Sequence, residues 1–417
     1  MPRKTALEAL ERFRRDGAWS RQVLSSVVKK HGIDSRDGAL AARLFYGTLQ
    51  NLYYLDYRID ERKKGRLEPK VRDILRLGAY QLLFMDRIPV SAAVNSSVQL
   101  ARDCGYARAS GLVNALLRRL GSERDSLEDI QGVGTAAYLS VKYSHPAWIA
   151  EELISLRGYE GAEAVLKADN TPAPVYIQTN TLRTTQQKLA ESMQAEPFEG
   201  LPGCLMLKSG DFADHPSFIS GEFYVQDPAA HLAVMAAEPR PGMRVLDACA
   251  APGGKSFAAA IAMENTGVVN ACDISEAKLN LVMDGSDRLG LDIIECSARD
   301  AREITGGDYD LVIADVPCSG LGVIRKKPDI RYREKTELDR LPELQTELLE
   351  AISTAVRPGG VLLYTTCTWR ERENGSIVDA FLKGHPEFIK QQERTFWPDL
   401  DGTDGFYVCR MERKNGI

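Results

Sequence analysis

The sequence predicts a three-part chain that ends in an α/β fold, a doubly wound and mostly parallel sheet. From Gly242 onward, apolar strand-like runs alternate with amphipathic helices, which is the pattern of such a sheet. From Thr5 to about Leu120, the apolar residues instead recur at helical spacing, which predicts an all-α bundle. Residues 143–235 mix one helix with short strands and Gly- and Pro-rich segments, so a small α+β connecting domain is expected between the two.

The length of 417 residues exceeds what one core usually serves, and two or three domains are expected. We place a helical domain at residues 1–140, the connecting domain at 143–235 and the α/β domain at 236–417. The polar stretch GSERDSLEDIQG reads as a linker after the first of them.

The amino-terminal part is predicted to contain five or six helices with a basic surface. One helical face collects Val71, Ile74, Leu75, Ala79 and Leu82. The net charge of the whole chain is -5, but residues 1–142 carry 25 Lys and Arg against 16 Asp and Glu, a surplus of 9 positive charges. Such a surplus favours contact with a polyanion, although a solvated helical surface would show it as well.

Composition excludes several classes of protein. No apolar run approaches the 18 or so residues of a membrane span, and the first residues lack the apolar centre of a signal peptide, so a cytoplasmic protein without membrane contact is expected. The eight cysteines are scattered singly, and histidines are few. That spacing argues against a zinc site and against a disulfide framework, so no metal is expected.

The α/β part can be followed element by element. Its expected helices cover residues 255–263 and 275–290, a long segment ending near Val356, and residues 374–384. Each apolar run with few charges is expected to form a strand, and ligands then belong at the carboxyl ends of these strands. The expected strands cover residues 243–248, 267–273, 292–298, 309–317, 359–367 and 405–412.

The stretch VLDACAAPGGKS joins the first of these strands to a helix. Pro252, Gly253 and Gly254 make a tight turn that lets a ligand approach the backbone, and the helix start offers free N–H groups. A phosphate-binding GxxxxGK[ST] loop would need glycine where Cys249 stands, and the GxGxxG pattern is absent. Neither an ATPase nor a dehydrogenase is predicted.

Two acids follow the next two strands. Asp273 ends the second strand, where a carboxylate can accept hydrogen bonds from ribose hydroxyls, and Asp300 follows the third, where it can bind an adenine amino group. Either acid alone could equally cap a helix or a turn. Together, and beside a glycine loop, they favour a ligand that has a ribose and an adenine but no phosphates. S-adenosylmethionine is such a ligand.

Two cysteines, Cys318 and Cys367, stand just after two other strands. Methyl transfer to the C5 carbon of a pyrimidine needs a thiolate that adds to C6 and makes C5 nucleophilic. A carboxylic acid near N3 helps as charge develops, and a base must then remove the C5 proton. Asp315, three residues before the first cysteine, and the two thiols can supply these parts.

The stretches DACAAPGGKS, ADVPCSGLGVIRKKPDIR and TTCTWRERENGSIV resemble the motifs of the RNA 5-methylcytosine methyltransferases, the NOL/NOP2/Sun group, as do GEFYVQDPAA and DGFYVCR. The segments LFYGTLQN, RLGAYQLLFM and GLVNALLRR resemble the NusB-type RNA-binding helical domain. The resemblance covers nearly the whole chain. It implies a Rossmann-like class I methyltransferase fold and, with a NusB-like domain in front, a bacterial enzyme that methylates a cytosine in small-subunit (16S) ribosomal RNA.

The resemblance also implies roles for single residues. Cys367 would be the nucleophile, Cys318 would assist release of the product, and Asp315 would contact the cytosine. The residues implied to hold S-adenosylmethionine are Cys249, Ala250, Ala251, Pro252, Gly253, Gly254, Lys255, Asp273, Asp300 and Asp315.

Two further segments bear on RNA. The Arg-x-Asn contact usual in the family's connecting domain is replaced here by Gln178, Thr179 and Asn180. A basic run follows Cys318 and is expected to hold the RNA backbone while the target base is turned out, although a charge run is often only solvated. This run consists of Arg325, Lys326, Lys327, Arg331 and Arg333.

The sequence therefore predicts a monomeric ribosomal RNA cytosine-C5 methyltransferase. A transfer RNA enzyme with the same chemistry is the first alternative, and the NusB-like domain favours ribosomal RNA over it. The second alternative is an RNA-binding scaffold with an inactive methyltransferase fold, against which the intact cysteine pair speaks.

Overall fold

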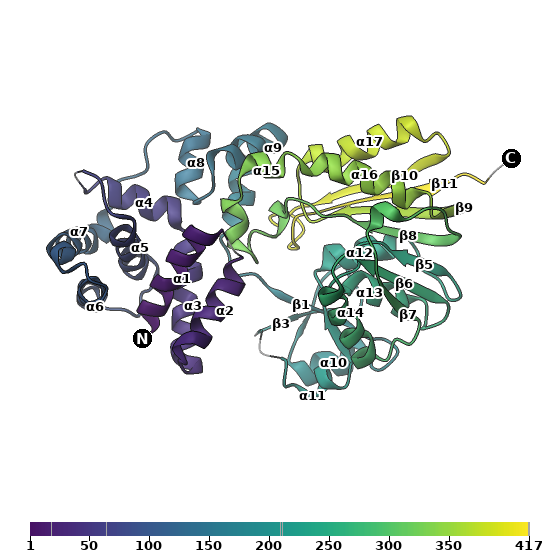
Figure 1. Ribbon diagram of the computed structural model, residues 1–417, viewed down its shortest axis with the longest axis horizontal. Helices are drawn as coiled ribbons and strands as arrows, with labels where there is room; N and C mark the ends of the chain where they lie inside the picture. Colours follow the sequence, from purple (N-terminus) through teal and green to yellow (C-terminus); the bar gives the residue numbers. More distant parts are fainter. Residues whose placement is uncertain (18, 64, 209, 211, 416–417) are drawn as a thin grey trace. The chain divides into compact units, whose positions relative to one another are not determined.

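The computed structural model describes residues 1–415 apart from 18, 64, 209 and 211, and the chain divides into two compact units (Figure 1). The helical unit comprises Met1–Thr171 and Lys326–Tyr332, and the α/β unit comprises Pro172–Arg325 and Arg333–Ile417. The division at Thr171 lies beyond the first border expected from the sequence, and the connecting segment is shared between the two units.

Helices make up the helical unit, with seven α-helices among the described residues of 1–123, where five or six were expected. These are α1 (Pro2–Asp16), α2 (Ser20–His31), α3 (Ser35–Gln50), α4 (Leu52–Asp60), α5 (Pro69–Phe84), α6 (Val90–Asp103) and α7 (Ser110–Glu123). They are followed by α8 (Ala136–Lys142) and α9 (Ala147–Ala168). The helix expected at residues 144–158 is the first segment of α9, and Gly158, with φ 70° and ψ 176°, separates it from a second segment that was not predicted.

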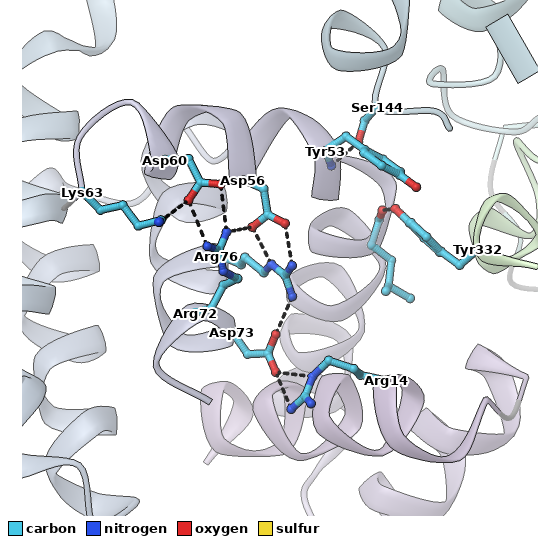
Figure 2. A network of polar contacts seen from close by, with 11 residues as sticks. Arg14, Tyr53, Asp56, Asp60, Lys63, Arg72, Asp73, Arg76, Ser144 and Tyr332 are labelled. Atoms are coloured by element: carbon cyan, nitrogen blue, oxygen red, sulfur yellow. Dashed lines mark hydrogen bonds and ion pairs between the residues drawn. The ribbon is translucent and has the colours of Figure 1, made fainter. Parts of the chain in front are cut away.

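The core of the helical unit confirms the predicted apolar face of α5, since Val71, Ile74, Leu75, Ala79 and Leu82 are all buried. Outside this core, α4 and α5 are joined by a network of ion pairs (Figure 2). Within it, Arg72 and Arg76 both bind the carboxylate of Asp56. No helix among the described residues is long and apolar enough to cross a membrane.

The connecting part forms a small antiparallel sheet in the α/β unit. Its strands β1 (Val175–Thr179), β2 (Glu196–Pro197), β3 (Cys204–Leu207) and β4 (Phe223–Val225) are arranged in the order β2-β3-β1-β4. Two helices, α10 (Gln186–Met193) and α11 (Pro216–Ile219), accompany them. This confirms the expected mixture of strands and helices.

A seven-stranded sheet in the order β10-β11-β9-β8-β5-β6-β7 confirms the predicted doubly wound fold. The four pairings among β9, β8, β5, β6 and β7 are parallel, whereas β11 pairs antiparallel with both β9 and β10. Strand β10 was not predicted. The strands are β5 (Arg244–Asp247), β6 (Val268–Asp273), β7 (Ile294–Ala298), β8 (Tyr309–Asp315), β9 (Val356–Thr366), β10 (Phe388–Phe396) and β11 (Phe406–Arg413).

Helices cover both faces of this sheet (Figure 1). Because side chains alternate along a strand, Leu246 and Val312 pack toward α16 and α17, while Val245 and Ile313 pack toward α12, α13 and α14. The predicted long helix is α16, which ends at Ser353, so that Val356 already belongs to β9. The helices are α12 (Pro228–Ala236), α13 (Gly254–Ala262), α14 (Glu276–Leu289), α15 (Lys335–Leu338), α16 (Leu341–Ser353) and α17 (Gly375–Gly384).

Candidate active site

The register of two parallel strands brings the two predicted cysteines together. Asp315 at the end of β8 lies opposite Thr365 in β9. The chain reaches Cys318 three residues beyond the first and Cys367 two residues beyond the second, and their Sγ atoms are 3.1 Å apart. The backbone N–H of Cys367 also donates to the Cys318 sulfur at 3.3 Å. Two thiols 49 residues apart in the sequence are thus neighbours at one edge of the sheet.

Asp315 is held from both sides. Its Oδ1 accepts a hydrogen bond from the Thr365 hydroxyl at 2.8 Å, and its Oδ2 pairs with the Lys255 ammonium at 2.6 Å. Burial lowers the pKa of Lys255, but Asp315, together with Asp247 and Cys367, outweighs burial and raises it. The sequence placed Lys255 in the cofactor loop, and its partnership with Asp315 was missed because the two residues lie on different strand ends.

The two thiols have different electrostatic surroundings. Hydrogen bonding to Cys367, followed by burial, raises the pKa of Cys318 well above its usual range. The two sulfurs share one hydrogen bond, in which either cysteine can be the donor. Cys367 is also among the groups whose negative charge raises the pKa of Lys255, so the ammonium favours a thiolate at Cys367.

A buried carboxylate, Glu373, fixes the loop that carries Cys318. Its Oε2 accepts the backbone N–H of Ser319 at 2.8 Å and the side-chain amide of Gln345 at 3.1 Å. The Gly322 N–H donates to the Cys367 carbonyl at 3.0 Å and joins the two loops directly. Sequence reasoning did not single out Glu373, because Glu371 and Glu373 share one short stretch and only packing distinguishes them.

The predicted glycine turn follows β5, which lies between β6 and β8. This is the point where the strand order reverses, and ligands of doubly wound sheets bind there. Helix α13 begins at Gly254, one residue before the expected start, and Gly253 has φ 108°. A Cβ atom at Gly253 would lie 2.5 Å from the Phe257 ring, so that both conformation and space require glycine.

A cavity of about 210 Å³ opens beside this turn. It is lined by Ala248, Cys249, Asp273, Ile274, Lys278, Asp300, Ala301, Arg302, Pro317, Leu344 and Leu348. Carboxylates stand there beside apolar side chains, which suits a nucleoside with hydroxyl groups and a flat ring. The residues present therefore fit the adenosine part of S-adenosylmethionine.

Both predicted acids of this cavity also bind the protein itself. Asp273 accepts the N–H groups of Ala251 and Ser275, at 3.3 and 2.9 Å. Asp300 pairs with the Arg302 guanidinium at 2.6 Å, and this hydrogen bond lowers its pKa. A carboxylate has about four acceptor positions, so each acid can bind a ligand as well. Burial raises the pKa of Cys249, a third lining residue, so its thiol is neutral.

The basic run after Cys318 differs from its prediction. Arg331 is fully buried, and its guanidinium binds oxygens of the helical unit. The guanidinium of Arg325 is almost buried and donates to the Thr403 carbonyl at 3.2 Å. The prediction that the run contacts RNA phosphates is therefore wrong for both arginines, because protein acceptors occupy them. Lys326 and Lys327 are exposed.

Gln178, Thr179 and Asn180, which replace the family's Arg-x-Asn contact, are buried as well. Their side chains donate to the carbonyls of Gln226, Gly203 and Gly221 respectively, at 2.7 to 3.1 Å. These side chains hold the α/β unit together. Among the residues that the structure describes, no group of three His, Cys, Asp or Glu could hold a metal ion.

Three family models match the chain: the NusB family at residues 1–122, the ferredoxin-like domain of RsmF/B-like methyltransferases at 145–209, and the 16S rRNA methyltransferase RsmB/F at 234–412. A probable ribosomal RNA small subunit methyltransferase B of Bacillus subtilis is 34% identical, and the match covers 99% of this chain and 98% of the relative. The chain belongs to the RsmB/F family of ribosomal RNA methyltransferases.

Other relatives agree with this assignment. The ribosomal RNA small subunit methyltransferase B of Pseudomonas putida is 33% identical over 98% of both chains. The crystal structure of PH0851 has a TM-score of 0.80 and 26% identity over 99% of both chains. A methyltransferase homologue of Pyrococcus horikoshii, with a TM-score of 0.59, shares the fold over 67% of this chain and 98% of its own, at 23% identity. The chain is thus an RNA methyltransferase.

Proposed function

We propose that this enzyme transfers a methyl group from S-adenosylmethionine to C5 of a cytosine in 16S ribosomal RNA, through a covalent bond between Cys367 and C6. The observation that carries the proposal is the 3.1 Å contact between Cys318 and Cys367, beside the pair of Lys255 and Asp315. Methylation of a nitrogen or oxygen needs no protein nucleophile, whereas methylation of C5 needs one, and a thiolate supplies it.

In the first half of the reaction, the Cys367 thiolate adds to C6, and a carbon–sulfur bond forms as the C5–C6 double bond is opened. Asp315 faces the ring and, in its protonated form, donates a proton to N3 as negative charge develops there. Lys255 holds Asp315 at 2.6 Å and keeps positive charge beside the thiolate. C5 is then an enamine carbon that can accept a methyl group.

In the second half, the C5 proton must leave before the carbon–sulfur bond can break. Hydrogen bonding to Cys367 is the largest cause of the raised pKa of Cys318. Once Cys367 is bound to C6 this cause disappears, which favours loss of the Cys318 proton, while burial and the carboxylates of Glu373 and Asp315 still raise its pKa. The Cys318 thiolate then takes the C5 proton, the C5–C6 double bond re-forms, and Cys367 leaves as a thiolate.

The methyl donor supplies an electrophilic methyl group when it is bound. Asp273 and Asp300 would hold its adenosine in the cavity next to the turn after β5, and the backbone of residues 249–254 would lie against its remaining part. These residues bind and orient the donor. The acid–base and nucleophilic roles belong to the residues at the end of β8 and in the loops after β8 and β9.

Small-subunit ribosomal RNA is the proposed substrate because the relatives at 33–34% identity over almost the whole chain are named for it. The basic surplus of residues 1–142 and the NusB family match at residues 1–122 support RNA binding by the helical unit. We further propose that the protein acts as a monomer in the cytoplasm.

Bisulfite mapping of ribosomal and transfer RNA from a deletion strain tests the substrate and the methylated atom together. We expect one 5-methylcytosine to disappear from 16S RNA and to return when purified enzyme and S-adenosylmethionine are added. Loss of a transfer RNA mark instead would redirect the substrate assignment. An unchanged pattern in both RNAs, with the donor still bound by the protein, would indicate an inactive scaffold.

A further inference from the structure

The loop between β8 and α15 (residues 316–334) is divided between the two units. Its first part, which carries Cys318, belongs to the α/β unit, whereas Lys326–Tyr332 belongs to the helical unit. Pro328–Tyr332 forms one short 3-10 helix, η5. We name Lys326–Tyr332 the anchor segment.

Arg331 makes the largest set of contacts in the anchor segment. Its Nη1 donates to the carbonyl oxygens of Gln50 at 2.7 Å and Ser144 at 3.1 Å. Its Nη2 donates to the carbonyl oxygen of Asp169 at 3.3 Å and to Oδ1 of Asn170 at 2.7 Å. Since its side chain is fully buried, this arginine is closed to solvent and to RNA.

The three carbonyl groups share one property, because each lies at the carboxyl end of a helix. Gln50 is the last residue of α3, Asp169 follows α9, and Ser144 lies two residues beyond α8. Carbonyl groups at helix ends lack partners within the helix and carry the negative end of its dipole. A guanidinium has five donors in a fixed plane and can serve all four acceptors, whereas a lysine ammonium has only three donors.

Two neighbouring side chains of η5 add to this attachment. Asp329 accepts the hydroxyl of Ser20, the first residue of α2, at 2.8 Å and is itself buried. The Tyr332 hydroxyl donates to the Leu49 carbonyl near the end of α3, and its ring stacks on Tyr53 at 6.0 Å between centroids (Figure 2). The side chains of Asp329, Arg331 and Tyr332 thus bind the anchor segment to the helical unit.

The first part of the same loop is bound to the α/β unit by several hydrogen bonds. Glu373 accepts the Ser319 N–H, Gly322 donates to Cys367, and the Arg325 guanidinium donates to the Thr403 carbonyl. Lys326, Lys327 and Pro328 lie between Arg325 and Asp329, the nearest residues of the two attachments. The loop of Cys318 is thus joined through a short piece of chain to a segment that is bound to the helical unit.

We propose that Arg331 is a positioning residue that fixes the anchor segment on the helical unit, so that RNA held by that unit is presented to the two thiols. The proposal rests on the proposed function, in which the helical unit binds RNA. Its physical basis is effective concentration: a fixed connection between a binding unit and a catalytic unit raises the local concentration of the target base. Arg331 itself touches neither RNA nor cofactor.

The test compares full-length Arg331→Met with Lys327→Met, a change at an exposed lysine of the same segment. For Arg331→Met we expect KM for a long 16S RNA fragment to rise about tenfold or more. The kcat at saturating RNA and the KM for S-adenosylmethionine should stay within about twofold, because the thiol loop keeps its own contacts. Hydrogen exchange of residues 326–333 should become faster. Lys327→Met should leave that exchange unchanged and, at most, lower the salt dependence of RNA binding by one phosphate contact.

Failure of this inference and failure of the proposed function would give different results. An active wild-type enzyme whose Arg331→Met variant keeps the wild-type KM for long RNA would overturn this inference and leave the proposed function standing. Wild-type protein that methylates no RNA would count against the proposed function. If Arg331→Met does not fold, Tyr332→Phe removes a single hydrogen bond of the anchor segment and is expected to raise KM in the same direction by a smaller factor. An unchanged KM in folded Tyr332→Phe would then overturn the inference.

Discussion

Lys255 and Arg331 are both buried cations, and the protein neutralises them in opposite ways. Lys255 faces a carboxylate, Asp315, at 2.6 Å, whereas Arg331 is surrounded by three carbonyl oxygens at helix ends and one amide oxygen. A carboxylate can change its bonding when a substrate ring arrives, but helix-end carbonyls are part of a fixed framework. We infer from this comparison that Lys255 takes part in the chemistry, whereas Arg331 maintains the architecture of the protein.

The largest expected effect lies on the chemical side of this comparison. Cys367→Ala removes the proposed nucleophile, so methylation should stop while RNA is still bound. Cys318→Ala should permit attack and methyl transfer but slow the release of the product, because the base for the C5 proton is lost. Denaturing electrophoresis with labelled RNA should show a covalent protein–RNA species in Cys318→Ala alone. An adduct in Cys367→Ala alone would reverse the two roles.

Replacing each buried cation separately sharpens the comparison. Lys255→Met leaves Asp315 without its partner and removes positive charge beside Cys367, so we expect kcat to fall by about 10²–10³. Arg331→Met should hardly change kcat. Single-turnover methylation at saturating RNA measures both, and similar losses of kcat in the two variants would contradict the division into chemistry and architecture.

The cofactor cavity gives a smaller effect. Asp273→Ala removes an acceptor for the ribose hydroxyls and should weaken binding of S-adenosylmethionine by about 1–3 kcal/mol. Affinity for RNA should be nearly unaffected. Calorimetry can compare this variant with Asp292→Ala, which removes an exposed carboxylate two residues before β7. Equal cofactor affinity in both variants would place the ribose elsewhere.

The ion-pair network of the helical unit should affect stability and not catalysis. Asp73 is buried and pairs with Arg76 at 2.7 Å and Arg14 at 3.2 Å (Figure 2). Asp73→Ala leaves both guanidinium groups short of an acceptor and should lower the free energy of unfolding by about 1–3 kcal/mol. Glu123→Ala, at a partly exposed partner of Arg62 and Arg119, should have a much smaller effect in the same denaturant titration.

His145 gives the smallest expected effect, and it depends on pH. Burial, and then the neighbouring Arg331 cation, lowers the pKa of His145 well below its usual range. The unfolded chain therefore binds a proton that the folded chain does not, so stability is lost as pH falls below about 6.5. Urea titrations at pH 5 and pH 7 should show this loss, and it should be smaller in folded His145→Asn. Identical losses in the two proteins would exclude His145 as the source.

Local pattern predicted the sheet strands that carry the site, because β5, β6, β8 and β9 are apolar runs bounded by turns. Strand β10 was missed, since its ends Phe388 and Phe396 are buried while most side chains between them are exposed. The two thiols could be placed at strand ends from the sequence, but their 3.1 Å contact follows from the register of β8 on β9.

Arg331 shows where such reasoning stops. In the sequence it resembles Lys327, a basic residue in a polar loop after Cys318. Its acceptors belong to residues 281, 187 and about 160 positions earlier in the chain. No local sequence pattern indicates contacts between residues so far apart in the chain. Burial of an arginine is also rare enough that a solvated or RNA-bound side chain was the better expectation.

The division of the chain between its units has a consequence for synthesis. Thr171 completes the first stretch of the helical unit, but the anchor segment follows only at Lys326. A ribosome adding 5–20 residues per second needs roughly 8 to 30 seconds to bridge that distance. During this interval the carbonyl groups that will bind Arg331 must be served by water, and the helical unit becomes complete only when most of the α/β unit has already emerged.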